Sequence, residues 1–174
     1  MEKDRSGHLH LTIQPFESIY TEAVVNLILG IQIGEFQVPI TRQDQPDLER
    51  IPAVYQRGKG NFWVALYAGE VVGTIAVIDF GNDMLALRKM FVHRDFRGRE
   101  TGTAQLLWAT LMHWSLEREI KGIYLGTIEK LIAARRFYIR NGFAEIAPEN
   151  LPENFPRMAV DTLFYKFTPV PSPR

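Results

Sequence analysis

The sequence lacks cysteine altogether, and it has no excess of charge of either sign. The absence of cysteine among its 174 residues excludes disulfide bonds, thiolate catalysis and cysteine metal sites. Its 20 basic and 20 acidic side chains cancel, so no overall field attracts nucleic acid or an anionic membrane. We therefore expect no nucleic-acid partner, and any anion must be bound by a local arrangement of groups.

Long hydrophobic runs are also missing. The most apolar early stretch, residues 23–33, is interrupted by Asn26, Gly30 and Gln32 and is too short to span a bilayer. The charged N-terminus has no apolar segment typical of a signal peptide. The four histidines show no metal-ligand spacing, so we expect no metal. These features predict a cytoplasmic protein without a membrane partner.

The remaining composition is that of a globular chain, with 46% hydrophobic and 23% charged residues. We expect a single domain over 1–174, with a frayed, proline-rich tail from about residue 168. Hydrophobic periodicity predicts an α/β fold in the order β-α-α-β-β-β-α-β-α-β-β. Strands are expected within 9–16, 61–67, 70–80, 84–92, 122–128 and 157–167, and helices within 17–36, 41–58, 104–120 and 129–143.

Four features of this prediction carry specific expectations. The first helix should bury one stripe and the third another, and their members are Ile19, Ala23, Val24, Leu27, Ile28 and Ile31, and Ala104, Leu107, Trp108, Leu111 and Trp114. The second helix has Asp44 as a candidate N-cap and Pro46 near its first turn. Ala68-Gly69-Glu70 gives the strongest hairpin signal in the chain.

The stretch "RGRETGTAQLL", residues 97–107, lies between an expected strand and an expected helix. The first-turn amides of that helix lack acceptors, and the helix dipole adds partial positive charge. Gly98 and Gly102 let the backbone curl around a ligand, and the hydroxyls of Thr101 and Thr103 and the charges of Arg97 and Arg99 are further donors. The pattern favours a phosphate or pyrophosphate site.

The alternative is an ordinary strand-to-helix turn with solvated arginines. Neither G-x-x-x-x-G-K-[ST] nor G-x-G-x-x-G after the first strand occurs, which argues against P-loop and dinucleotide folds. The equally basic "RGKG" at residues 57–60 precedes a strand, so its amides should not converge, and we interpret it as a solvated loop.

"RETGTA", residues 99–104, resembles the (Gln/Arg)-x-x-Gly-x-(Gly/Ala) acetyl-CoA signature of the GNAT superfamily of N-acetyltransferases. "AARRFYIRNGF", residues 133–143, resembles the family's second signature, a helix that carries a tyrosine and ends in Asn-Gly-Phe. The order of elements matches over most of the chain. The resemblance implies a mixed, centrally splayed β-sheet flanked by helices, the GNAT-like acyl-CoA N-acyltransferase fold.

The resemblance also implies acetyl-CoA as co-substrate, inserted between the strands at 85–92 and 122–127. Backbone groups of Met90, Phe91 and Val92 would pair with the pantetheine arm and polarise the thioester carbonyl. Thr127 or Lys130 would supply a polar contact after the second strand. The pyrophosphate would lie on the loop, whose implied cofactor-binding residues are Arg97, Gly98, Arg99, Glu100, Thr101, Gly102, Thr103 and Ala104.

The implied reaction is direct attack of a primary amine, on an unidentified small molecule or peptide, at the thioester. Tyr138 matches the family's general acid, although a core aromatic on an amphipathic helix is the other interpretation. Many family members carry a glutamate on the central strand where this sequence has Arg88. The general base therefore stays open between Glu35, Asp79, Asp161 and a water relay.

The resemblance places acceptor contacts in residues 30–45, so Glu35 and also Asp79 are candidate substrate-binding residues. Two other classes of function compete with the enzyme: a non-catalytic acyl-CoA-binding or regulatory module, and a nucleic-acid binder using the arginines at 94, 97 and 99. Interleaved Asp95 and Glu100 argue against the latter. A homodimer is possible, and the acceptor and the use of other acyl groups are undetermined.

Overall fold

The computed structural model describes residue 3 and residues 9–170, and its centre is a mixed seven-stranded sheet in the order β1-β2-β3-β4-β5-β7-β6. The strands are β1 (Leu11–Pro15), β2 (Asn61–Tyr67), β3 (Glu70–Asp79), β4 (Met84–Val92), β5 (Gly122–Thr127), β6 (Ala144–Ile146) and β7 (Leu163–Phe167). The α-helices are α1 (Thr21–Leu29), α2 (Ile51–Val54), α3 (Thr103–Glu117) and α4 (Ile132–Arg140). The predicted order and fold class are confirmed. The one-domain boundary stays a prediction, and the expected tail lies partly outside the described residues.

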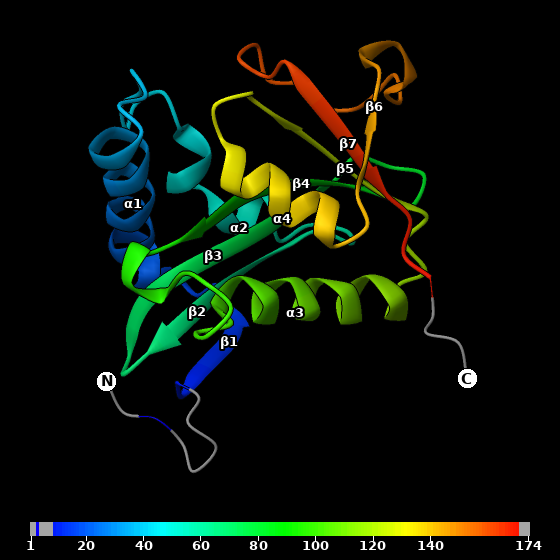
Figure 1. The fold of residues 1–174 in the computed structure, drawn as a ribbon. Coiled ribbons are helices and arrows are strands. Elements are labelled where there is room, and N and C mark those ends of the chain that lie inside the picture. The colour runs from blue at the N-terminus through cyan, green and yellow to red at the C-terminus, as the bar shows by residue number, and fades with distance from the viewer. Residues whose placement is uncertain (1–2, 4–8, 171–174) are drawn as a thin grey trace.

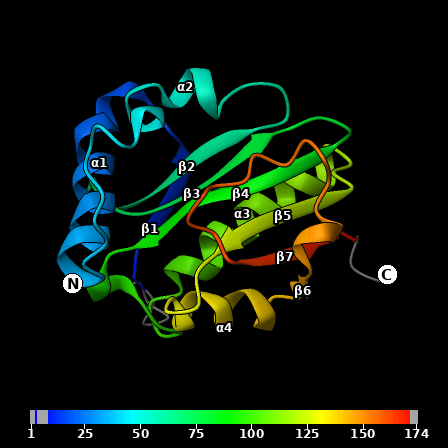
Figure 2. The same cartoon turned by 90° about the horizontal axis from the view of Figure 1, so that it is seen from above.

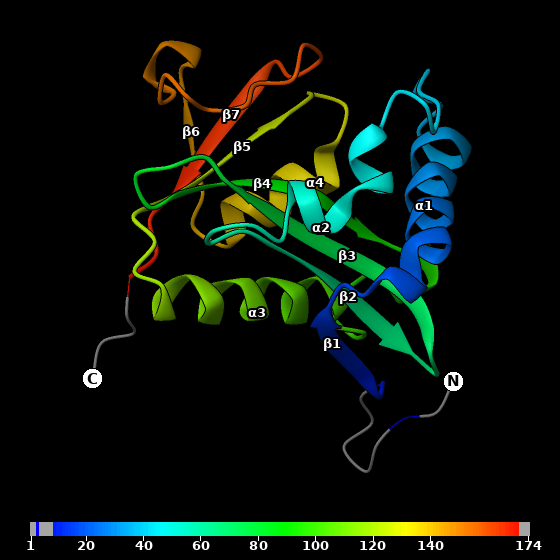
Figure 3. The same ribbon diagram turned by 180° about the vertical axis from the view of Figure 1, so that it is seen from behind.

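Helices cover both faces of the sheet. On one face α3 and α4 bury a core that includes Leu107, Leu111 and Tyr138 (Figure 1). On the other face α1 and α2 bury a second core around Val25 and Ile51, as the view from behind also shows (Figure 3). The sheet therefore holds the segments after β4 and before β2 at fixed positions relative to each other.

The sheet opens between its two central strands. β4 and β5 run parallel and pair only through Met84–Ala86 and Gly122–Tyr124. Beyond these pairs the strands diverge (Figure 2), and β5 pairs with β7 on its other side from Ile123 to Thr127. The β4 edge after Ala86 therefore has backbone groups without a partner strand at the position where the sequence implies a cofactor.

The hairpin turns follow the prediction. Ala68 and Gly69 both have positive φ, 49° and 81°, which is the backbone of a tight two-residue turn between β2 and β3. The turn before β4 also uses positive φ, at residues 81–83.

The predicted stripe on the first helix is partly wrong. Ile19 is 82% exposed and Ala23 is also exposed, whereas Val24, Val25 and Ile28 are fully buried. Residues 18–20 form a separate 3₁₀ turn (Ser18–Tyr20) before α1 begins, so Ile19 does not share the buried face of the helix. The helical path then loosens into a π-helix (Gly30–Glu35), which the periodicity did not indicate.

The second helix is also shorter than predicted. A 3₁₀ turn (Pro46–Glu49) and the four-residue α2 replace one continuous helix. Pro52 has no N–H to continue a helical ladder across Arg50. Asp44 caps no helix, because its carboxylate accepts instead from the backbone N–H and the hydroxyl of Thr41, both at 2.8 Å.

Two further boundaries differ from the sequence prediction. α3 ends at Glu117, before the expected end near residue 120. Within this helix Trp114 is half-buried, and its indole N–H donates to the Lys59 carbonyl at 2.8 Å. The last strand begins only at Leu163, because residues 151–162 form an irregular segment between β6 and β7.

Candidate acyl-CoA site

The glycine loop has the backbone that an anion site requires. Gly98 and Gly102 have φ of 96° and 68°, a conformation that other residues adopt only with strain. An added Cβ at either position would meet no atom within 4 Å, so the space above the loop is open. Gly102 immediately precedes α3, whose first-turn amides have no acceptor within the helix. The residues present therefore fit a pyrophosphate.

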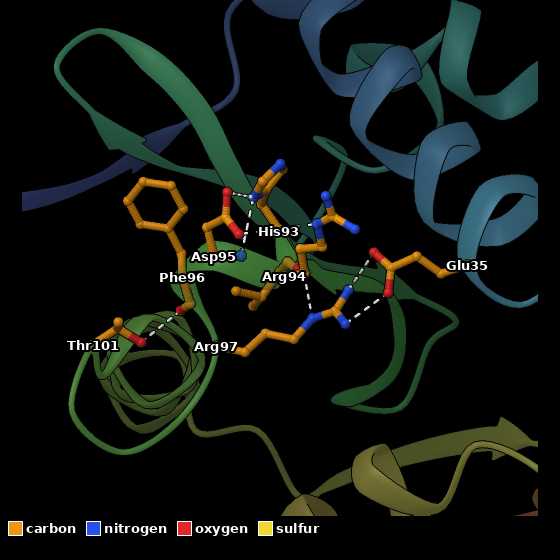
Figure 4. Close-up of polar contacts among 8 residues, drawn as sticks. Glu35, His93, Arg94, Asp95, Phe96, Arg97 and Thr101 are labelled. Carbon is orange, nitrogen blue, oxygen red and sulfur yellow. Dashed lines mark hydrogen bonds and ion pairs between the residues drawn. The ribbon is translucent and has the colours of Figure 1, made fainter. Parts of the chain in front are cut away.

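The threonine hydroxyls do not behave as expected. The Thr101 hydroxyl donates into the loop itself, to the Phe96 carbonyl at 2.6 Å (Figure 4). It also lies within hydrogen-bond distance of the Gly98 carbonyl, at 3.0 Å. The Thr103 hydroxyl is fully buried and has no partner within the described chain. The Gly102 amide also donates to the Gly98 carbonyl at 3.1 Å. These bonds shape the loop, and its remaining amides are the groups available to a ligand.

Arg97 is already engaged by the protein, contrary to the expectation of a free phosphate ligand. Its Nε donates to the Val92 carbonyl at 2.8 Å, and its two terminal nitrogens donate to Glu35 at 2.7 and 2.9 Å (Figure 4). These hydrogen bonds lower the pKa of Glu35, so that carboxylate stays ionised. Glu35 consequently joins the π-helix to the loop and is poorly suited to act as the base.

A hollow of about 380 Å³ adjoins this pair. It is lined by Asn26, Leu27, Gly30, Ile31, Gly34, Glu35, His93 and Arg94. The side chains of Arg99 and Glu100 are exposed on the loop. The structure thus brings Glu35 and the predicted acceptor segment next to the predicted cofactor loop.

The three strand residues predicted for the pantetheine arm are not equivalent. The Val92 carbonyl already accepts a hydrogen bond from Arg97, and it is therefore not available to the pantetheine arm. Met90 packs toward the α3 face of the sheet and Phe91 toward the α1 face. Their backbone lies in the part of β4 that β5 does not pair with. Thr127 is buried at the end of β5, and Lys130 is exposed beyond it.

Tyr138 projects from α4 into the core and is 8% exposed. Its ring lies 5.6 Å from the Phe143 ring and 6.3 Å from the Tyr165 ring, measured between centroids. Burial, together with the nearby negative charge of Asp161, raises the pKa of Tyr138 to about 12. The phenol is therefore protonated at neutral pH, as a proton donor must be.

Asp161 lies against β5, where Gly126 leaves room for it. A Cβ at Gly126 would collide with the Asp161 carboxylate, whose Oδ2 is buried without a hydrogen-bond partner in the described residues. Burial raises the pKa of Asp161, and the positive charge of Arg88 opposes that shift. Of the candidate bases, Asp161 is the one that lies beside Tyr138.

Asp79 is not part of this arrangement. It pairs with Leu85 at the opposite end of β4, and its carboxylate accepts from the backbone N–H groups of Lys59 and Gly81 at 2.8 and 2.9 Å. These bonds stabilise two turns, so the structure gives Asp79 a local role. The "RGKG" loop precedes β2 as expected, but its prediction as a solvated loop is wrong. Gly60 is buried, and the Lys59 ammonium lies 2.6 Å from the Asp83 carboxylate.

The described part of the chain contains no group of three histidine or carboxylate side chains arranged to hold a metal. Within the same residues, no helix has the length and apolar character needed to cross a membrane.

A sheet that parts between two central parallel strands, with an amide-lined loop at the open end, defines an acyl-CoA-dependent acyltransferase fold. Residues 58–145 match the model of the acetyltransferase (GNAT) domain. The crystal structure of a GNAT-family acetyltransferase from Staphylococcus aureus is 41% identical, with a TM-score of 0.86 over 91% of this chain and 98% of that one. The chain belongs to the GNAT acetyltransferases, which transfer an acyl group from acetyl-CoA.

Two further relatives bear on the ligands. A PaiA N-acetyltransferase from Thermoplasma acidophilum, solved in complex with coenzyme A, has a TM-score of 0.72 over 92% of this chain and 99% of that one, at 10% identity, which shows the fold alone. The N-acetylaspartate synthetase of Xenopus tropicalis is 33% identical over 107 residues, 60% of this chain. The chain spans only 38% of the length of that relative.

Proposed function

We propose that this protein transfers the acetyl group of acetyl-CoA to a primary amine of a small molecule or peptide by direct attack. The observation that carries the proposal is the parting of β4 from β5 after three residue pairs, with the open loop of Gly98 and Gly102 at the same end. The amides of residues 99, 101, 103 and 104 hold the pyrophosphate. The backbone of Met90 and Phe91 positions the thioester and polarises its carbonyl.

In the proposed reaction the amine nitrogen forms a bond to the carbonyl carbon, and the carbon–sulfur bond then breaks. Tyr138 donates its phenolic proton to the departing thiolate. Asp161, whose negative charge acts on Tyr138, accepts a proton from the amine directly or through water. The raised pKa of Asp161 makes its carboxylate a stronger base, and the raised pKa of Tyr138 keeps the phenol protonated until the thiolate leaves.

The name of one relative bears on the kind of molecule that accepts the acetyl group. An N-acetylaspartate synthetase, by that name, makes an acetylated amino acid. Since this chain covers a minor part of that relative, the name supports only that the acceptor of this protein is an amine. Which amine it is depends on the residues of the acceptor site. A homodimer stays a prediction that light scattering decides.

A thiol-release assay tests the proposal with little background. Because the chain has no cysteine, a thiol-reactive dye reports only free coenzyme A. We expect coenzyme A to be released from acetyl-CoA when a suitable amine is present, together with an equal amount of acetylated amine detected by mass spectrometry. Acetyl-CoA binding without transfer to any amine, across amino acids, polyamines, aminoglycosides and peptides, would instead support a non-catalytic binding module.

A further inference from the structure

Two consecutive cationic side chains of β4 lie on one face of the sheet. In a regular strand, Arg88 and Lys89 would point to opposite faces. The register shifts here, because Thr74 pairs with Phe91 while Ala76 pairs with Arg88, so one residue of β3 faces two of β4. Lys89 has a φ of 49°, and its carbonyl accepts from the buried Thr74 hydroxyl at 2.6 Å. This bulge re-aims the side chains that follow Leu87.

Lys89 is satisfied by the protein. Its ammonium donates to the Gln45 side-chain oxygen at 2.7 Å and lies 3.3 Å from the Asp47 carboxylate. The side chain is only 12% exposed, and burial lowers the pKa of Lys89 while Asp47 opposes the shift. Lys89 therefore connects β4 to the 3₁₀ turn that precedes α2.

Arg88 lacks such a partner. One terminal nitrogen donates to the Pro156 carbonyl, and its guanidinium lies 5.9 Å from the centre of the Phe155 ring. Its Nε is buried with no hydrogen-bond partner, and within residues 9–170 the guanidinium forms no ion pair. The other terminal nitrogen of Arg88 also forms no hydrogen bond within these residues but is not buried. A bound carboxylate can reach that nitrogen and pair with the guanidinium charge.

A complementary unsatisfied acceptor lies nearby. Asp161 has a buried oxygen without a partner, and Arg88 is close enough to favour its charged form. The two side chains nevertheless form no direct ion pair in the described structure. Both belong to segments that meet above the β4–β5 divergence, where the connection between β6 and β7 passes over these strands (Figure 2).

The charge of this cluster decides between classes of ligand. Arg88 and Lys89 balance Asp47 and Asp161, so the four groups are neutral together. A polyamine would add only positive charge, and a phosphate only negative charge, whereas a zwitterion adds one of each. We infer that the acceptor is an α-amino acid, its carboxylate bound by Arg88 and its amino group directed to Asp161. This inference rests on the proposed acetyl transfer and names its substrate class.

Matched acceptor pairs test the inference. L-Phenylalanine is compared with phenethylamine, L-leucine with isopentylamine, and L-glutamate with γ-aminobutyrate, each pair differing by the α-carboxylate. The remaining protein L-amino acids are screened for the best acceptor, which is then compared with its decarboxylated amine. We expect kcat/KM for the best amino acid to exceed that for its amine on the order of 10²-fold or more, because the amine leaves the Arg88 guanidinium without a carboxylate partner.

Variants assign the discrimination to Arg88. Arg88→Met and Arg88→Lys should each reduce the preference for the amino acid, Arg88→Met to within about threefold of parity, without changing acetyl-CoA affinity. Asp161→Asn should weaken the amino acid and the amine alike. Arg140→Met is the matched control, because Arg140 also lies over a ring, that of Phe137 at 5.5 Å, but projects from the exposed end of α4. A thermal melt confirms that each variant folds.

The outcomes separate the two claims. Equal rates for amino acids and decarboxylated amines, or an undiminished preference in Arg88→Met, would overturn the inference and leave the proposed function intact. Absence of transfer to every amine would overturn the proposed function. Calorimetric titration of the amino acids into the protein with coenzyme A then decides the inference independently: binding lost in Arg88→Met supports it, and no binding contradicts it.

Discussion

The proposed chemical role of Tyr138 can be tested separately from the packing of its ring. Tyr138→Phe keeps the ring among Phe143 and Tyr165 and removes only the hydroxyl. If the phenol protonates the thiolate, kcat should fall on the order of 10²-fold while acetyl-CoA affinity stays constant. Steady-state kinetics beside a thermal melt measures both quantities, and full turnover in the variant would return Tyr138 to a purely structural role.

The raised pKa of Tyr138 has a consequence for stability as well as for rate. Because the folded state favours the protonated phenol, its contribution to the free energy of unfolding is present below pH 10 and is lost as the pH rises toward about 12. The proton donor should accordingly remain protonated at pH values near 10, where a free phenol ionises.

Arg97 should hold the loop in place through its ion pair with Glu35 rather than bind a phosphate of the cofactor. Since its guanidinium is committed to Glu35 and Val92, we expect Arg97→Ala to weaken coenzyme A and dephospho-coenzyme A equally. Both side chains are partly exposed, 39% and 27%, so the pair should stabilise the fold by less than about 1 kcal/mol. Calorimetry with the two ligands decides, and a selective loss for coenzyme A would show that Arg97 leaves Glu35 to bind the 3′-phosphate.

At the scale of elements, the loop before α3 depends on the left-handed backbone of Gly102. Gly102→Val should weaken acetyl-CoA strongly, because a branched side chain would enter the open space where phosphate oxygens must approach the amides. The matched control is Gly81→Val, with a φ of 95° in the turn at the opposite end of the sheet. Both variants should lose about 1–2 kcal/mol of stability from backbone strain. Unchanged acetyl-CoA affinity in Gly102→Val would exclude the loop as the pyrophosphate site.

The bulge in β4 makes a second prediction at this scale. Thr74→Val keeps the shape of the side chain and removes the buried hydroxyl that donates to the Lys89 carbonyl. The unsatisfied carbonyl should lower the free energy of unfolding by about 1–3 kcal/mol. If the bulge also aims Arg88, KM for the acceptor should rise while acetyl-CoA affinity is retained. Denaturant titration and kinetics together measure this, and a variant with unaltered stability would show that the bulge does not need the hydroxyl.

Features formed by consecutive residues could be predicted from the sequence, whereas features formed by residues far apart in the chain could not. The loop at 97–104 was recognisable because its glycines, strand and helix are consecutive. Arg88 and Asp161 come together only through the order β4-β5-β7, which brings a late segment over an early strand, so neither residue's pattern revealed the pair. Ile19 was misplaced for a local reason, because periodicity does not report where a 3₁₀ turn becomes an α-helix.

At the scale of the whole molecule, the central claim is that acetyl-CoA binds where β4 and β5 part and lies on the loop before α3. Hydrogen–deuterium exchange with and without saturating acetyl-CoA tests this over the entire chain. We predict protection concentrated in residues 87–92 and 97–104. Unchanged exchange in both segments, or protection confined to residues 148–157 around the separate hollow of about 230 Å³, would contradict the account.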